Sequence, residues 1–262
     1  MKDIFSAEVL ENKQIADHIF ELLLHCPNEA GRARVGQFIS IFTGNPAMIL
    51  PRPLSLCEIN KEEGTFRIIY RAEGDGTKFI SKYKKGELLN CLGPVGQAFR
   101  VDPNKKNVAI VGGGIGVPPL LELAKQIRKA SPDAKISVYL GFRSKQNVFL
   151  EDDFKKFADL VVITTDDGSY GEKNNAVAVM PKGNEFDHTY GCGPGIMLKF
   201  LSKYSEERNI PCTVSMEEHM ACSIGACLAC VVKIKQGEDG WAYRRVCCSG
   251  PVFADAKELI WE

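Results

Sequence analysis

Short apolar runs separated by turn residues fill the first part of the chain. Runs of this kind occupy residues 19–24, 37–42 and 66–71, with Gly and Pro between them. Several short runs with such punctuation are typical of antiparallel strands. The pattern therefore predicts an antiparallel β-barrel over residues 1–101.

A different pattern begins near Asn107. Continuous apolar runs of the length of buried parallel strands alternate with segments of helical pattern. The expected strands occupy residues 108–111, 136–140, 160–164 and 188–191, and the expected helices occupy residues 119–129 and 194–207. This alternation predicts a parallel-sheet α/β nucleotide domain over residues 102–210.

The chain becomes irregular and rich in cysteine after Ile210 and Pro211. Glycines are spaced through this last part, as expected of a small domain that folds around a cofactor. We therefore expect a third, small domain over residues 211–262. The predicted fold class is α/β plus β, with three domains in series, which suits a length of 262 residues.

The composition is that of a folded protein without an extended charged surface. Hydrophobic residues make up 45% and charged residues 25%, and Lys plus Arg equals Asp plus Glu at 33 each. The balanced charge argues against nucleic acid as a partner. No apolar stretch reaches the roughly 20 residues of a membrane helix, and residues 1–6 do not resemble a signal peptide. We expect a cytoplasmic protein and no membrane partner.

The ten cysteines are unevenly distributed, and a clustered subset indicates metal or redox chemistry. Cys222, Cys227 and Cys230 have the spacing C-x4-C-x2-C, and the adjacent Cys247 and Cys248 follow later. This is the plant-type [2Fe-2S] spacing, with three thiolates from one loop and a distant fourth. The alternative is a zinc site, which usually has two separated C-x2-C knuckles. The spacing alone leaves either cysteine of the pair as the fourth ligand.

A glycine-rich loop joins an expected strand to an expected helix over residues 111–119. Its glycines allow close approach of a diphosphate to the helix N-terminus. The loop departs from the dinucleotide fingerprint, because Val117 replaces the third glycine and no acidic residue follows the next strand at Gly141. The nucleotide-binding candidates here are Gly112, Gly113, Gly114 and Gly116.

Two further strand ends carry residues suited to the same ligand. Asp166 and Gly168 follow one expected strand, and Cys192, Gly193 and Pro194 follow another. Ligands of open parallel sheets bind outside the carboxyl ends of the strands, so these loops are expected to line one nicotinamide-nucleotide crevice. The alternative is ordinary turn chemistry, which uses the same residue types. The other cysteines outside the cluster spacing are expected to be packing residues: Cys26, Cys57, Cys91 and Cys212.

The barrel region has its own anion-binding candidates. Arg52 begins a segment that ends in the hydroxyl of Ser55, and Arg71 ends a strand just before the Gly74–Thr77 turn. Two cations and a turn with free N–H groups suit a diphosphate. Taken alone, both segments also fit simple turns.

Taken in order, these motifs resemble the ferredoxin-NADP reductase superfamily. Within it, the Glu217–Cys230 and Arg245–Phe253 segments resemble the electron-transfer subunits of class 1B dihydroorotate dehydrogenases. The resemblance spans almost the whole chain. It implies a barrel that binds FAD, an α/β domain that binds NAD and a C-terminal [2Fe-2S] domain.

The resemblance also implies site residues. The family's R-V-C-x-x-G-P-V-F segment supplies the fourth cluster ligand, which selects Cys247 over Cys248. Leu54 stands where plant-type reductases carry an aromatic residue, so the flavin is expected to rest on an aliphatic side chain. No catalytic acid or base is implied. The implied FAD contacts are Arg52, Pro53, Leu54, Ser55, Ile69, Tyr70, Arg71, Gly76 and Thr77.

The family's scheme belongs to pyrimidine biosynthesis. Nicotinamide exchanges electrons as a hydride pair and the cluster carries one, so a flavin must stand between them. The resemblance implies transfer from dihydroorotate to FMN on a catalytic partner subunit, then to the [2Fe-2S] cluster, FAD and NAD+, in a heterotetramer of two of each subunit. It also favours NAD over NADP.

Two other functions remain open from the sequence. A related FAD and [2Fe-2S] subunit of a bifurcating transhydrogenase, a sulfide or sulfite system or a hydrogenase would share every cofactor motif. A zinc-binding interaction module without enzymatic activity is a different class, and it would lack the visible absorption of a flavin and a cluster.

Overall fold

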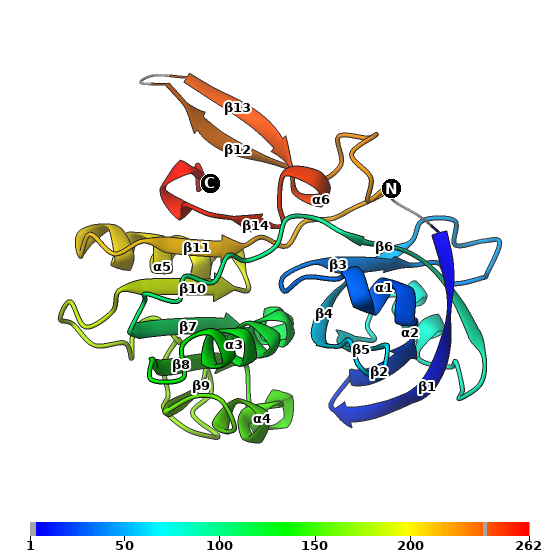
Figure 1. Ribbon diagram of the computed structural model, residues 1–262, viewed down its shortest axis with the longest axis horizontal. Helices are drawn as coiled ribbons and strands as arrows, with labels where there is room; N and C mark the ends of the chain where they lie inside the picture. The colour runs from blue at the N-terminus through cyan, green and yellow to red at the C-terminus, as the bar shows by residue number, and fades with distance from the viewer. Residues whose placement is uncertain (1–3, 238–239, 262) are drawn as a thin grey trace.

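The first part of the chain folds into a closed antiparallel barrel (Figure 1). The computed structural model describes residues 4–237 and 240–261. Around the barrel the strands follow the order β1-β2-β5-β4-β3-β6. The strands are β1 (Ile4–Ala16), β2 (Ile19–His25), β3 (Phe38–Ile41), β4 (Arg52–Asn60), β5 (Thr65–Arg71) and β6 (Leu88–Val95), with short helices α1 (Pro27–Arg32) and α2 (Asp75–Ile80) between them. The predicted barrel is confirmed.

Strand β3 shows how the sequence alternation sets the two faces of the barrel. Ile39 and Ile41 are fully buried in the barrel core, together with residues of β2 and β5. Successive side chains of a strand point to opposite faces. Phe38 and Ser40 therefore face away from the barrel interior, and Phe38 packs into a second core with Cys230 and Cys247. The outer face of β3 is thus where the barrel meets the cysteine-rich region.

The central domain is a six-stranded sheet of order β14-β11-β10-β7-β8-β9. All neighbouring strands are parallel except the edge pair β11 and β14. In Figure 1 the parallel strands point toward the barrel, so their carboxyl ends meet it. The strands are β7 (Asn107–Gly113), β8 (Lys135–Phe142), β9 (Leu160–Thr165), β10 (His188–Cys192), β11 (Cys212–Ser215) and β14 (Val252–Phe253).

Helices of modest length accompany this sheet. The longest are α3 (Pro118–Ala130) and α5 (Gly195–Glu207), with 13 residues each, and the others are α4 (Glu151–Lys155) and the 3-10 turns η1 (Gly114–Gly116) and η2 (Lys145–Asn147). Pro118 and Pro119 start α3, where a missing N–H costs nothing. Among residues 4–237 and 240–261, no helix combines the length and apolar character needed to cross a membrane.

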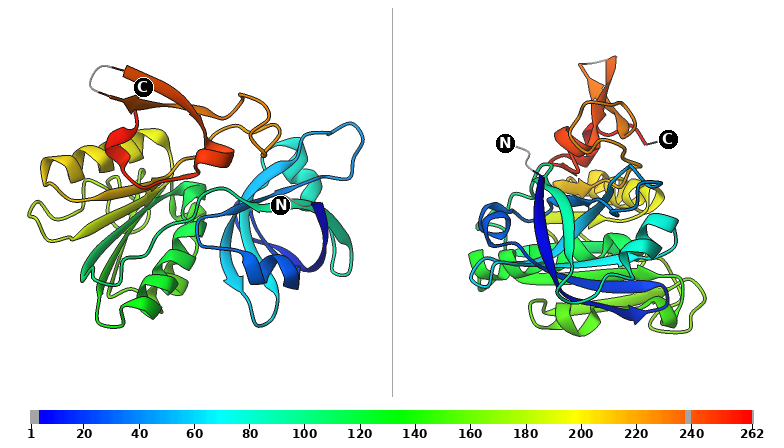
Figure 2. Two further views of the ribbon diagram at one scale, coloured as in Figure 1. Left: turned by 45° about the horizontal axis from the view of Figure 1, so that its top comes forward. Right: turned by 90° about the vertical axis from the view of Figure 1, so that its right-hand side faces the viewer.

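The last part of the chain leaves the sheet and returns to it. After β11 it forms a cysteine loop, the hairpin of β12 (Val231–Gln236) and β13 (Gly240–Arg245) and the short α6 (Val246–Ser249), before β14 and η3 (Ala256–Glu258). Figures 1 and 2 show the hairpin projecting from the junction of barrel and sheet and extending above the central sheet. Strands β11 and β14 fall within the expected 211–262 domain yet pair with the central sheet. The domain boundaries stay a prediction, and residues 1–3, 238–239 and 262 lie outside the described part.

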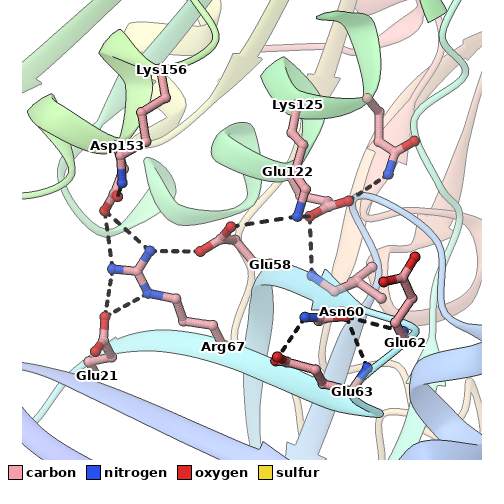
Figure 3. A network of polar contacts seen from close by, with 12 residues as sticks. Glu21, Glu58, Asn60, Glu62, Glu63, Arg67, Glu122, Lys125, Asp153 and Lys156 are labelled. Carbon is pink, nitrogen blue, oxygen red and sulfur yellow. Dashed lines mark hydrogen bonds and ion pairs between the residues drawn. The ribbon is translucent and has the colours of Figure 1, made fainter. Parts of the chain in front are cut away.

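A network of charged side chains joins the barrel to the central domain (Figure 3). Arg67 of β5 contacts Glu21 at 2.6 Å, Glu58 at 2.7 Å and, on α4, Asp153 at 3.1 Å. Glu122 of α3 is 1% exposed and accepts a hydrogen bond of 3.1 Å from the backbone N–H of Ile59. These contacts fix the barrel strands against α3 and α4.

Candidate functional site

Glycines bring two loops together at the carboxyl ends of neighbouring strands. Strands β7 and β10 pair in parallel, with Gly112 opposite Cys192. A Cβ atom on Gly116 would overlap the backbone of Gly193, and a Cβ on Gly193 would approach the backbone N of Gly113 to 2.9 Å. The two loops can therefore pack back to back only without side chains, which explains their glycines.

A cavity of about 470 Å³ opens beside these loops. Of the residues expected to bind nicotinamide, Gly113, Gly114, Asp166 and Pro194 line it. Other lining residues were not among the expected cofactor contacts: Ile115, Gly141, Phe142, Arg143, Asn147, Phe149, Asn175, Ala176, Ile196, Met197, Phe200 and Glu217. The cavity has the size and the mixed apolar and polar lining of a small-molecule site.

The remaining expected nicotinamide residues shape the loops rather than line the cavity. A Cβ on Gly112 would press on Val117, so this glycine admits the helix that follows. Gly168 has a φ of +74° beside Lys173, a conformation that favours glycine. Cys192 is 1% exposed within the core. Their direct contact with a nucleotide stays a prediction.

A second cavity of about 240 Å³ lies between the barrel and the sheet. It is lined by Phe38 of β3, by residues that follow β11 and by most of the expected flavin contacts, namely Pro53, Leu54, Ser55, Ile69, Tyr70 and Arg71. Arg71, Ile115 and Glu217 line both cavities. The expected flavin and nicotinamide sites are therefore adjacent.

Arg52 and Gly76 form a compact unit at the edge of the barrel. A Cβ on Gly76 would collide with the guanidinium of Arg52, whose Nη1 donates to the carbonyl of Leu50. Thr77 donates its hydroxyl to the carbonyl of Gly74 at 3.0 Å. The glycine makes room for a fixed cation beside backbone N–H groups, and this arrangement fits the diphosphate of a dinucleotide.

Glu217 is a site residue that sequence reasoning missed. Its side chain is exposed to the cavities that it lines, and partial desolvation by the surrounding protein raises the pKa of its carboxyl group, a shift that the nearby Arg71 partly opposes. The residue follows β11, so parallel pairing carries it to the same edge of the sheet as the glycine loop. Its only signal in the sequence was its place at the start of the Glu217–Cys230 segment.

The cysteine loop presents its first thiol to a ring of backbone donors. Burial alone raises the pKa of Cys222, but N–H groups of Cys227, Ile224 and Ala226 outweigh it and lower the pKa to about 6. The N–H of Cys227 lies 3.3 Å from the Cys222 sulfur. Ser223 makes this turn with a φ of +58°, which costs an L-residue roughly 1–2 kcal/mol. The backbone of the loop thus favours the thiolate form of Cys222, which is the form that binds metal.

The four expected ligands lie in two pairs. Cys222 and Cys227 are linked by a side-chain hydrogen bond and are half-buried. Cys230 and Cys247 form the inner pair, and the N–H of Cys247 lies 3.5 Å from the Cys230 sulfur. Burial and this neighbour raise the pKa of Cys247 to about 12. Cys248 lies instead against Gly225, where a Cβ atom would meet its sulfur at 3.0 Å.

This donor set fits a [2Fe-2S] cluster better than a single metal ion. Such a cluster takes four thiolates, two on each iron, and the structure supplies two pairs with N–H donors toward their sulfurs. The ligand assignment itself stays a prediction.

Comparison with known proteins identifies the family. Residues 217–259 match the model of the iron-sulfur cluster binding domain of dihydroorotate dehydrogenase B. The chain is 43% identical over 256 residues to the dihydroorotate dehydrogenase B (NAD+) electron transfer subunit of Streptococcus mutans, covering 96% of each chain. It is 39% identical over 250 residues to that of Bacillus cereus strain G9842, covering 94% of each. The chain belongs to this family.

A solved structure resembles this electron transfer subunit along nearly its whole length. It is an NADH-dependent reduced ferredoxin-NADP oxidoreductase studied for flavin-based electron bifurcation. The TM-score is 0.82 at 30% identity, and the match covers 97% of this chain and 90% of that one. The predicted family, three-part fold class and electron-transfer function are confirmed.

Proposed function

We propose that the chain carries electrons between NAD(H) and the FMN of a catalytic subunit that oxidises dihydroorotate. The predicted cofactor set of FAD, [2Fe-2S] and NAD is that of the family to which the chain belongs. One observation carries the proposal. The cavity of about 470 Å³, here called the nicotinamide cavity, shares Arg71, Ile115 and Glu217 with the cavity of about 240 Å³, here called the flavin cavity. Residues Met216–Met220 then lead from the flavin cavity directly to Cys222.

The cofactors supply the redox chemistry, because a flavin exchanges hydride with nicotinamide and single electrons with an iron-sulfur cluster. The protein supplies binding and orientation. Arg52 and Arg71 provide cations for the FAD diphosphate, and Leu54 provides an apolar surface for the flavin ring. Gly113, Gly114 and Pro194 allow the nicotinamide nucleotide to approach the backbone at the carboxyl ends of β7 and β10.

Cys222, Cys227, Cys230 and Cys247 are the proposed cluster ligands. The inner pair is buried in the core that includes Phe38 of the barrel, and the outer pair is closer to the surface. This arrangement gives the cluster one side toward the flavin-binding barrel and one side toward a partner. It suits a carrier between two flavins on different subunits.

Apolar side chains near the outer pair mark the surface for the partner. Ile224 is 43% exposed and Leu228 is 72% exposed, both within the cysteine loop. Ile49 and Leu50 are also exposed, on a barrel loop that shares a cavity with Glu218–Met220. Exposed apolar groups that surround a redox centre favour docking of another protein. The proposed occupant is the FMN-containing catalytic subunit, in a heterotetramer with two copies of each subunit.

We place the protein in the cytoplasm. All ten cysteines are described and none is in a disulfide. Free thiols in this number suit a reducing compartment, where a cluster with thiolate ligands is also assembled from reduced cysteines.

Reconstitution tests the division of labour. The purified chain should oxidise NADH with artificial dyes, because its own flavin and nicotinamide sites suffice. It should reduce NAD+ with dihydroorotate only after the catalytic subunit is added. Reduction of NAD+ by dihydroorotate with the chain alone would overturn the proposal.

A bifurcating transhydrogenase subunit is the second candidate. It is favoured by the 30% identity to the NADH-dependent ferredoxin-NADP oxidoreductase, whereas the relatives at 43% and 39% identity favour dihydroorotate dehydrogenase. Mass spectrometry of the native complex would distinguish them, since the two proposals require different partner subunits.

A further inference from the structure

One hydrogen bond connects the flavin-binding barrel to the cysteine loop across 183 positions of sequence. The hydroxyl of Ser40 on β3 donates to the hydroxyl of Ser223 at 2.7 Å, and both side chains are buried. Buried hydroxyls without partners are costly, so each residue satisfies the other. Ser223 lies within the C-x4-C cluster motif without being one of its cysteine ligands, and Ser40 lies outside every cofactor motif of the sequence.

Each end of this bond is fixed to a proposed cofactor site. Ser40 lies opposite Pro53 in the β3–β4 pair, and Phe38 and Pro53 of that pair line the flavin cavity. Ser223 directly follows Cys222, and its left-handed conformation turns the chain so that later N–H groups face the Cys222 sulfur. A displacement of Ser223 would therefore displace the first cluster ligand relative to the flavin.

We propose that Ser40 and Ser223 are positioning residues that fix the cysteine loop against the flavin-binding barrel and so set the flavin-to-cluster geometry. The inference rests on the proposed function, because it assumes that FAD and a cluster occupy the two sites. A substitution that removes the Ser223 hydroxyl would leave the loop free to sample positions in which the cluster is misplaced. Only the fraction of molecules in the competent arrangement would transfer electrons at the full rate.

Two substitutions separate the hydroxyl from the backbone. Ser40→Ala removes the donor and keeps the Ser223 backbone unchanged. Ser223→Gly removes the acceptor but suits the left-handed conformation, in which glycine has no steric cost. The glycine variant should therefore unfold at a temperature equal to or above that of Ser40→Ala, although both lack the same bond.

The measurement uses the full chain, purified without oxygen with its FAD and cluster and mixed rapidly with NADH. Flavin reduction should keep the wild-type rate in both variants. Cluster reduction should slow by roughly fivefold, the factor that corresponds to the net contribution of about 1 kcal/mol from one hydrogen bond. The electron paramagnetic resonance spectrum of the dithionite-reduced cluster should broaden, because the loop occupies several positions. The double variant should be no slower than either single variant, since both act through one contact.

Ser205→Ala is the matched control. Ser205 makes another buried hydroxyl pair, with Thr189 at 2.8 Å, between α5 and β10. Its loss should lower the unfolding temperature but leave cluster reduction and the resonance spectrum unchanged. If Ser40→Ala behaves like Ser205→Ala, the pair is only structural and the inference is wrong. If the wild-type chain lacks a flavin or cluster spectrum, it is the proposed function that fails.

Discussion

The guanidinium of Arg67 on the barrel lies 3.1 Å from the carboxylate of Asp153 on α4, so one ion pair spans the two nucleotide-binding domains. Glu21 and Glu58 hold the same guanidinium on the barrel side. The side chains are about three-quarters buried or more, so solvent screens them less than surface pairs. Because the flavin cavity lies between these domains and shares residues with the nicotinamide cavity, the pair also bears on how the two ligands meet.

Asp153→Asn should lower the free energy of unfolding by about 1–2 kcal/mol, because a charge-assisted contact of the Arg67 guanidinium is lost. Urea unfolding of the FAD-loaded chain measures this. Asp152→Asn is the control: Asp152 is 92% exposed and pairs only with Lys155 among the described residues, so it should change stability by less than about 0.5 kcal/mol. Equal effects at the two positions would contradict a role for the interdomain pair.

Cys247→Ser should remove the cluster, whereas Cys248→Ser should retain it. Cys247 is fully buried and paired with Cys230, while Cys248 packs against Gly225 and lies 3.8 Å from the carbonyl of Arg245. Iron and acid-labile sulfide content, together with visible absorption, measure the outcome. Loss of iron in the Cys248 variant alone would reverse the ligand assignment.

Local pattern was enough to predict the main strands and the two longest helices of the central domain. The helix expected at 119–129 is α3 (Pro118–Ala130), and the strand expected at 188–191 is β10 (His188–Cys192). The signals for these elements are apolar periodicity and flanking Gly and Pro. Both signals come from residues that are close together in the sequence, so they are visible without the structure. Strand β14 has only two residues and gave no such signal.

The candidate site was only partly predictable, for a physical reason. Motifs with their own backbone geometry, such as the cysteine loop and Gly113–Gly114, could be found because their residues are consecutive. Glu217 and Arg143 reach the cavity through the convergence of strands β11 and β8 at one edge of the sheet. The contact between Ser40 and Ser223 likewise depends on the packing of two domains, which no local pattern encodes.

Asp166→Asn should weaken the preference for NAD over NADP. Asp166 lines the nicotinamide cavity together with Arg143, and a carboxylate there repels the extra phosphate of NADP and can bind a ribose hydroxyl. Loss of one such charge corresponds to about 1 kcal/mol, so the ratio of kcat/KM for NADPH to that for NADH should rise roughly fivefold.

Asp167→Asn is the control for this specificity change. The Asp167 carboxylate accepts hydrogen bonds from the N–H and hydroxyl of Ser169 at 2.9 Å and 2.7 Å instead of lining the cavity. Steady-state kinetics with both reduced nucleotides should give this variant a ratio of kcat/KM for NADPH to that for NADH close to the wild-type ratio. An unchanged ratio in the Asp166 variant would remove this residue from the specificity determinants.

His188 at the start of β10 is half-buried, and its Nδ1 atom is buried without a hydrogen-bond partner among the described residues. Its ring stacks on Tyr190 with centroids 4.2 Å apart, and Nε2 lies 2.9 Å from the hydroxyl of Thr213. That hydroxyl donates to the carbonyl of Ala254, so it accepts from Nε2. Protonation of Nδ1 would bury an unsatisfied N–H. Burial accordingly lowers the pKa of His188 to about 4, and Lys105 adds to the shift.

The pH dependence of stability follows from this shift. The pKa in the folded protein lies below the ordinary value of 6.5, so the unfolded chain binds the proton more tightly, and stability is lost as pH falls from about 6.5 through 4. Between pH 7.5 and pH 5 the contribution of His188 amounts to about 2 kcal/mol. His188→Phe keeps a ring against Tyr190 but cannot bind a proton. Urea unfolding at the two pH values should therefore show a fall in stability for the wild type that exceeds the fall for the variant by about that amount. Equal falls would mean that His188 is protonated as readily in the folded chain as in the unfolded one.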